Sequence, residues 1–430
     1  MSSDGGRKAG HRSAVDDDGG VQPRWKVIGP GLVVAATGVG AGDLVATLAA
    51  GSLYGYTLLW AVVVGVILKI ILVEGAGRYT LATGYTIFEG WRTLGRWTTW
   101  YFGPYIIIWG FVYGATAMSS TALPLAALFP GVPLLVWAVL MGVAGFLLVW
   151  FNAYATFEKI TAALIATMFL TVVGLAIIAT PNIPQMLAGL RPIIPDGGLV
   201  YTLALAGGVG GTITLAAYGY WLREKGWITP KWVKVMRIDN TMAYVLTGVF
   251  VLAMLIVGAE VIQAAGVSVS AGDEGLVDLS DVLDERYGRV IGTAFLVGFW
   301  AASFSSIIGV WNGVSLMFAD FWGNMRGVES GHPDTRVGGR YFKFYLVWLT
   351  FPPMVLLLLG KPIGLILTYG VLGALFMPFL ALTLLGLLNG SRIPAEHANK
   401  LWTNVLLGIT ALLFAVLGAN QLWGSITEVF

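Results

Sequence analysis

An acidic residue ends a glycine-rich run inside the first long apolar stretch of the chain. The run spans residues 37–43 and reads TGVGAGD. A carboxylate in such a stretch is costly, and it usually faces the interior of a helix bundle or a water-filled cavity. Beside carbonyls freed by a glycine-interrupted helix, Asp43 would suit a hard cation that prefers oxygen ligands. Asp43 could also accept backbone N–H bonds at the start of the helical segment that begins there, and the two roles are compatible.

A second glycine-rich run, GGVGGT, occupies residues 207–212. A Gly-Val-Gly triplet begins at position 38 in the first run and at position 208 in the second. These glycines could serve only close helix packing. Because the first run also carries an acid, we favour a pair of broken helices whose freed carbonyls and half-helix ends bind a cation. The candidate ligands are Thr37, Gly40, Asp43, Gly210, Thr212 and Thr214, with further hydroxyls from Ser303, Ser305 and Ser306.

The available side chains favour a hard cation. There is no Cys, no Met lies in either run, and His11, His332 and His397 all fall in predicted termini or loops. Oxygen ligands alone favour Mg²⁺ or Mn²⁺ over Fe²⁺ or Zn²⁺. An organic or monovalent cation is the alternative, because aromatic faces attract organic cations. The candidate aromatics, which could equally be packing residues, are Tyr218, Trp300, Phe304, Trp311 and Tyr369.

The composition excludes an ordinary soluble protein. Of 430 residues, 57% are hydrophobic and 11% charged, and the mean hydropathy is +0.80. We expect an all-helical integral membrane protein, because a helix needs about 20 apolar residues to cross a bilayer. Eleven such stretches are present, at 29–51, 56–80, 102–128, 131–151, 158–180, 199–222, 239–263, 290–318, 342–360, 363–388 and 402–424.

The loop charges predict the orientation. Twenty Lys and Arg residues lie on the side of the N-terminal tail, against four on the other side. This bias predicts a cytoplasmic N-terminus, a disordered cytoplasmic tail over 1–26 and, after eleven spans, an extracytoplasmic C-terminus in the cell (plasma or inner) membrane.

The second span carries two charged residues, Lys69 and Glu74. Glu74 precedes Arg78 by four residues, which favours an ion pair on one helix face. We expect Lys69 to extend its ammonium toward the membrane surface. A tethered cation inside the bundle is the alternative.

The spans divide into two halves and a final helix. The first half, 27–190, and the second, 191–390, each hold five spans, and 391–430 holds the eleventh. An odd number of spans per half inverts the second half relative to the first. Inverted halves with paired interrupted helices are typical of secondary transporters. No nucleotide-binding loop, catalytic motif or nucleic-acid patch is present, so we expect neither an enzyme nor a resident cofactor.

The chain resembles the NRAMP (natural resistance-associated macrophage protein) divalent-metal transporters over about 25–425. The matching stretches are 50–60 (AGSLYGYTLLW), 78–84 (RYTLATG), 157–160 (FEKI), Ile238-Asp239, Ala301-Ala302 with Ser305-Ser306, and 377–379 (MPF). The resemblance implies the inverted-repeat fold of the bacterial leucine transporter, with broken spans one and six and alternating access. It also implies that Ser305 and Ser306 face span one, as in the Na⁺ site of relatives with this fold, although adjacent serines often bond their own helix.

The sequence departs from the family at its metal ligands. The family's Asp-Pro-Gly-Asn in span one falls on residues 40–43, read GAGD, and its Met-Pro-His in span six falls on 214–216, read TLA. Span three has no acid, and Tyr369 stands where a Gln is expected. We therefore expect a transporter of a hard divalent cation, compatible with a monomer in the lipid bilayer. A carrier of another small solute and a non-transporting sensor remain as alternatives.

Overall fold

The computed structural model describes residues 30–38, 41–151, 154–208, 210–263, 282–328, 331–360 and 362–429. The expected disordered tail, 1–26, lies outside this part of the chain. The described residues form helices, turns and loops without a strand. Seven of their helices are long and apolar enough to cross a membrane, which agrees with the integral membrane protein expected.

The unbroken spans follow the expected stretches closely. They are α3 (Leu59–Thr83), α5 (Arg96–Leu128), α6 (Leu134–Phe151), α7 (Tyr154–Ile178), α11 (Val233–Val257) with a π-helical extension η3 (Gly258–Gln263), α13 (Arg289–Met325), α16 (Pro362–Leu388) and α17 (Leu401–Val429). Connecting segments form short helices, namely α4 (Ile87–Thr93), α8 (Ile183–Ala188), η2 (Pro230–Trp232), η4 (Pro333–Thr335) and η5 (Ala395–His397).

Spans one and six are both interrupted, as the glycine runs predict. Span one consists of α1 (Pro30–Gly38) and α2 (Ala41–Tyr54). Span six consists of α9 (Leu199–Leu203), the π-helical turn η1 (Ala204–Gly208) and α10 (Thr214–Glu224). Between η1 and α10, Gly210 and Gly211 have φ angles of +75° and +91°. Residues with a Cβ rarely adopt these angles, so the glycines permit the break.

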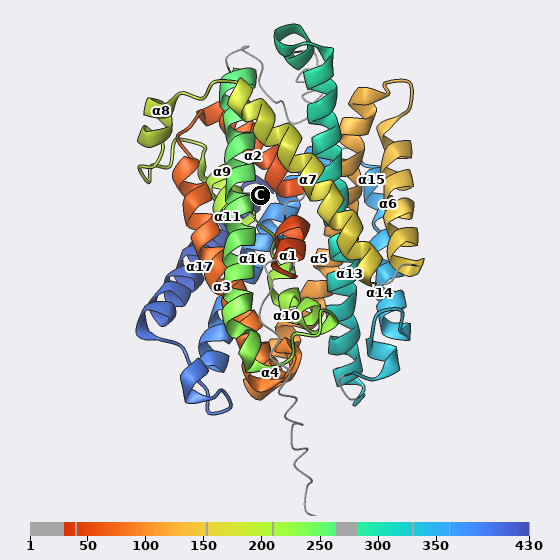
Figure 1. Cartoon of the computed structure of the whole chain (residues 1–430), viewed down its shortest axis with the longest axis vertical. Coiled ribbons are helices and arrows are strands. Elements are labelled where there is room, and N and C mark those ends of the chain that lie inside the picture. Colours follow the sequence, from red (N-terminus) through yellow and green to blue (C-terminus); the bar gives the residue numbers. More distant parts are fainter. Residues whose placement is uncertain are drawn as a thin grey trace, which may run out of the picture.

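The two breaks touch each other through their backbones. A Cβ added to Gly38 would overlap with the carbonyl of Gly210 and the amide nitrogen of Gly211. A Cβ on Gly211 would lie 3.1 Å from Gly38 Cα. The interrupted ends of spans one and six therefore meet in the middle of the bundle, where α1 and α10 lie among α3, α11 and α13 (Figure 1).

Span nine is broken as well, and the expectation of one continuous helix over 342–360 was wrong. The span consists of α14 (Arg340–Thr350) and α15 (Met354–Leu357). Pro352 and Pro353 stand between the two helices. Two successive prolines remove two N–H donors and clash with the preceding turn, which ends a helix.

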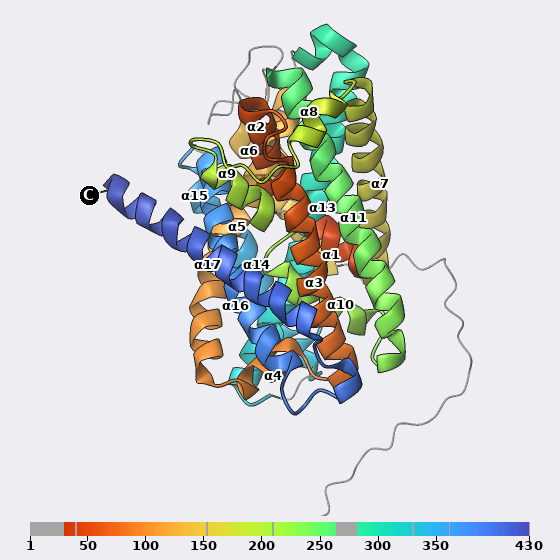
Figure 2. The ribbon, with the colours of Figure 1, turned by 90° about the vertical axis from the view of Figure 1, so that its left-hand side faces the viewer.

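The helices differ in how much of their surface they bury. α13 packs against α1, α5, α7, α10 and α14 and is largely buried. By contrast, α6 and α7 leave large apolar side chains exposed, including Phe151, Leu170 and Ile177. Such a surface suits contact with lipid. α17 packs along α16, and its C-terminal end projects from the bundle (Figure 2).

The ion pair expected in span two is present. Arg78 Nε lies 3.0 Å from Glu74 Oε1, and Arg237 Nε of α11 lies 2.8 Å from the same oxygen. The buried Arg78 also donates to Asn399 Oδ1 at 2.7 Å. Glu74 and Arg78 thus link α3 to α11 and to the loop before α17.

The contact between the breaks predicts the effect of adding one methyl group. Gly38→Ala should lower the stability by about 1–3 kcal/mol, because the backbones of spans one and six must move apart to accommodate the Cβ. Gly174→Ala is the matched control, since a Cβ there meets nothing within 4 Å in α7 and Ala is the better helix former. Thermal unfolding of the purified protein should show a lower Tm for the first variant and an equal or higher Tm for the second. Equal Tm values for Gly38→Ala and the wild type would contradict the contact.

Candidate functional site

Span one contributes a buried carbonyl and a hydroxyl at its break. Thr37 is buried in the last turn of α1, and its Oγ1 donates to Val33 O of the same helix at 2.6 Å. The carbonyl of Thr37 accepts a bond from Ser306 Oγ of α13 at 2.7 Å. The side chain of Thr37 therefore donates within its own helix, and its carbonyl accepts a hydrogen bond from span eight.

The two adjacent serines of span eight face different partners. Ser306 Oγ also lies 2.7 Å from Tyr113 Oη of α5, so a hydrogen-bonded chain runs from span three through span eight to the break of span one. Ser305 Oγ instead donates to Ala302 O of its own helix at 2.7 Å. Ser306 thus faces span one as expected, whereas the bond of Ser305 is the local one that serines in helices often make. A Na⁺ site at these serines stays a prediction.

Span six contributes two buried threonine hydroxyls. Thr212 Oγ1 lies 3.5 Å from Tyr369 Oη of α16. Thr214 Oγ1 is buried and has no hydrogen-bond partner among the described residues. A buried hydroxyl without a partner is costly, so Thr214 is a polar group available to a ligand.

The ammonium of Lys69 donates hydrogen bonds to backbone carbonyls at the break of span six. Lys69 is fully buried near the middle of α3. Its Nζ donates to Gly207 O at 2.6 Å and also to Gly211 O. The expectation that Lys69 extends toward the membrane surface was wrong. The carbonyl ends of the break attract a positive charge more strongly than a distant interface does.

Two of the predicted ligands fall on parts of span one that the structure describes less fully. Gly40 lies outside the described residues. Asp43 is the third residue of α2, and the described part of the chain includes its backbone but not its side chain. An acid in the first turn of a helix complements the positive partial charge of the N-terminus. Asp43 as a cation ligand therefore stays a prediction.

Asp239 of α11 holds the start of span one, a role that sequence reasoning missed. Its Oδ2 accepts from Gly31 N at 2.6 Å and from Tyr218 Oη of α10 at 3.0 Å. The carboxylate thereby satisfies one of the free N–H groups in the first turn of α1. The Ile238-Asp239 pair was visible in the sequence, but the partner of Asp239 lies 208 residues away.

Aromatic rings from spans three, eight and ten gather beside the breaks. Trp109 and Tyr113 stack with ring centres 4.6 Å apart, and Tyr369 packs edge-on against Tyr113 at 5.0 Å. Trp311 lies 6.4 Å from Tyr113. Of the five aromatics expected, Trp311 and Tyr369 therefore belong to this aromatic cluster.

The other three aromatics lie elsewhere. Tyr218 bonds Asp239, and Trp300 and Phe304 stack on each other at 5.5 Å on α13, with Trp300 Nε1 3.4 Å from Met141 Sδ. Within the described residues, no three His, Cys, Asp or Glu side chains are grouped so as to hold a metal ion. His332 and His397 lie at the short helices η4 and η5, away from the broken spans.

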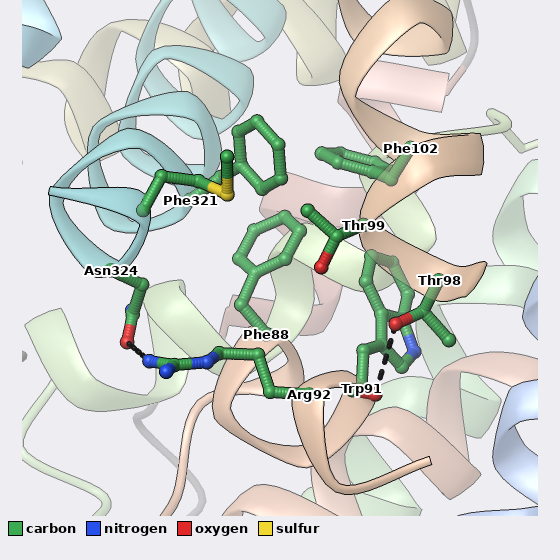
Figure 3. Close-up of a pocket in the computed structure, with 9 residues that line it drawn as sticks. Phe88, Trp91, Arg92, Thr98, Thr99, Phe102, Phe321 and Asn324 are labelled. Carbon is green, nitrogen blue, oxygen red and sulfur yellow. Dashed lines mark hydrogen bonds between the residues drawn. The ribbon is translucent and has the colours of Figure 1, made fainter. Parts of the chain in front are cut away.

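A pocket of about 140 Å³ (Figure 3) lies beside α4, at one end of the bundle (Figure 1). It is lined by residues of α4, α5 and α13, including Phe88, Trp91 and Phe102. Arg92 Nη1 at its edge donates to Asn324 Oδ1 at 3.3 Å. None of its lining residues belongs to spans one or six, so the pocket is separate from the breaks.

Comparison with known proteins finds relatives that are named as metal transporters. A 27% identical relative over 314 residues, the "Divalent metal cation transporter MntH" of Chromohalobacter salexigens, matches 68% of this chain and 71% of its own. The protein of the same name from Bacillus subtilis is 23% identical over 414 residues, covering 91% and 90% of the two chains.

Solved structures show the fold. The manganese transporter of Eremococcus coleocola superposes with a TM-score of 0.74 at 18% identity, covering 91% of this chain and 85% of its own. MhsT in complex with L-phenylalanine gives a TM-score of 0.62 at 15% identity, covering 90% and 96%. The likeness to both confirms the expected leucine-transporter-like architecture.

A family model described as "Natural resistance-associated macrophage protein-like" matches residues 31–424, which is nearly the whole chain. It covers both broken spans, the serines of span eight and the aromatic cluster. The chain therefore belongs to the Nramp family, as the resemblance of its motifs indicated.

Proposed function

We propose that the protein is a secondary transporter that carries a hard divalent cation, Mg²⁺ or Mn²⁺, by alternating access. The observation that carries the proposal is the backbone contact between the breaks of spans one and six. Broken helices place carbonyls without a partner in their own helix, and helix ends, at membrane depth, which is tolerated only where protein covers them or they line a polar site. The relatives named as divalent metal cation transporters support the choice of cargo.

The proposed ligands are oxygens. Asp43 supplies the carboxylate, and Thr37, Gly40 and Gly210 belong to the backbone around the breaks. Thr212 and the unpartnered hydroxyl of Thr214 complete the set from span six. Oxygen-only coordination suits Mg²⁺ and Mn²⁺ better than Fe²⁺ or Zn²⁺. The cation is the transported substrate, and we propose neither a resident cofactor nor a catalytic step.

The aromatic cluster favours a second candidate cargo, an organic cation. Trp109 and Tyr113 pack edge-on with Tyr369, whose hydroxyl lies 3.5 Å from Thr212 Oγ1. Aromatic faces attract organic cations, which need no carboxylate cage. Two further alternatives are a transporter of a monovalent cation and a sensor with the same fold that transports nothing. Uptake measurements distinguish these alternatives.

The membrane arrangement follows from the loop charges. We propose that the N-terminus is cytoplasmic, the C-terminus extracytoplasmic and the protein a monomer in the cell membrane. In this arrangement the halves 27–190 and 191–390 are inverted repeats that move relative to each other, and 391–430 adds the last helix.

Removing the carboxylate of Asp43 should abolish cation uptake. In proteoliposomes, the wild type should take up Mn²⁺ or Mg²⁺ saturably, and Asp43→Ala should not, because the cation loses its only charged ligand in the proposed set. Isothermal titration of both ions into purified protein should show the same loss of binding. Asp196→Ala is the matched control, since Asp196 is exposed outside the spans and its removal should leave uptake unchanged.

Two outcomes would contradict parts of this proposal. Uptake by Asp43→Ala at the wild-type rate would remove Asp43 from the ligand set. A wild type that binds neither ion but accumulates an organic cation would favour the second candidate, and a folded protein that moves no solute would favour the sensor.

Ser305 and Ser306 are proposed as a second cation site, which a paired substitution tests. If both hydroxyls bind Na⁺, then Ser305→Ala and Ser306→Ala should each remove a Na⁺-dependent rise in Tm. If Ser306 only joins the helices, Ser306→Ala should lower stability by about 1–3 kcal/mol without changing the response to Na⁺, because Thr37 O and Tyr113 lose a partner. Ser305→Ala should then have a much smaller effect, because it removes only a bond within one helix.

A further inference from the structure

The carbonyls at the break of span six are arranged around one side chain of span two. Gly207 is the last residue but one of the η1 turn, and Gly211 follows the left-handed Gly210. The carbonyl oxygens of Gly207 and Gly211 both accept from Lys69 Nζ. Gly210 O, which lies between them in the chain, accepts from Tyr244 Oη of α11 at 3.0 Å. Side chains of neighbouring spans therefore bind these three carbonyls.

The backbone of span two is shaped to bring Lys69 there. Gly65 lies one helical turn before Lys69, on the same face of α3. A Cβ on Gly65 would lie 3.0 Å from the carbonyls of Leu205 and Ala206, so its absence lets α3 approach the η1 turn closely. Lys69 has no exposed surface. A buried ammonium is costly unless its hydrogen-bond donors are satisfied, and carbonyls at a helix end satisfy them well.

We propose that the break of span six is a monovalent-cation site whose permanent occupant is the ammonium of Lys69. The ligand class is a small cation with no more than one charge: the tethered primary ammonium in the wild type, and a free alkylammonium, Na⁺ or K⁺ if the tether is removed. While Lys69 stays in place, Gly207 O and Gly211 O are unavailable to the cargo. Lys69 also links span two to span six by hydrogen bonds, so the two spans should move together during transport. The inference does not depend on which solute is carried.

Lys69→Ala should turn the tethered site into one that binds a free cation. The substitution removes the three methylenes and the ammonium beyond Cβ and leaves two carbonyls without that donor. In choline chloride, whose cation is bulky and has no N–H group, the variant should have a lower Tm than the wild type. Adding propylammonium should raise that Tm saturably, and Na⁺ or K⁺ should raise it less.

Two variants serve as controls for the cation dependence. Lys69→Met fills the space without a charge, so it should lose stability and gain no response to any cation. Lys231→Ala removes an exposed lysine and should behave as the wild type. The proposal is overturned if the Tm of Lys69→Ala responds to these cations no more than that of the wild type. It is also overturned if Lys69→Met is as stable as the wild type.

A cysteine at position 69 provides a second measurement in case Lys69→Ala does not fold. The chain has no Cys, so Lys69→Cys would carry a single thiol. Aminoethyl methanethiosulfonate forms a disulfide with that thiol, releases a sulfinate and leaves a side chain with a terminal ammonium. Ethyl methanethiosulfonate reacts in the same way but leaves a neutral side chain of similar length. The aminoethyl side chain is one atom longer than that of lysine, so it should recover only part of the wild-type Tm in choline chloride, and the ethyl adduct should recover less. Equal Tm values for the two adducts would overturn the proposal.

Discussion

Every backbone N–H and C=O inside a bilayer must have a partner, because hydrocarbon offers none. Unbroken helices meet this requirement within themselves, but spans one and six do not. Other spans satisfy several of their free groups: Asp239 binds the start of α1, Ser306 binds Thr37 O, Tyr244 binds Gly210 O, and Lys69 binds Gly207 O and Gly211 O. Three other spans, α3, α11 and α13, therefore supply these partners.

Two of these partners, Ser306 and Lys69, come from helices that carry a glycine at their contact with the broken spans. Gly309 on α13 lies against Thr37, and Gly65 on α3 lies against the η1 turn, so both spans approach the breaks closely. Gly38 and Gly211 let the breaks themselves touch. The high glycine content therefore positions the polar groups, as well as permitting the left-handed turns at Gly210 and Gly211.

The spans and both glycine breaks could be predicted because apolar length and glycine runs are local signals. Pro352 and Pro353 were also a local signal, and they should have predicted the break in span nine. Ser306 could be placed toward span one through the family resemblance. The partners of Lys69 and Asp239 could not be predicted. Lys69 lies 138 residues from Gly207, and Asp239 lies 208 residues from Gly31. The hydrophobic pattern of a helix does not show which other helix it will contact.

The buried ammonium constrains any cargo that binds at the same breaks. Two unit charges about 4 Å apart repel by about 4 kcal/mol at an effective dielectric constant of about 20, and a divalent ion meets about twice that repulsion. A divalent cargo bound there would need a carboxylate to offset Lys69, which is the role that we propose for Asp43. A singly charged organic cation would meet half the repulsion. The charge of Lys69 therefore constrains the charge of the cargo, whichever oxygen atoms bind it.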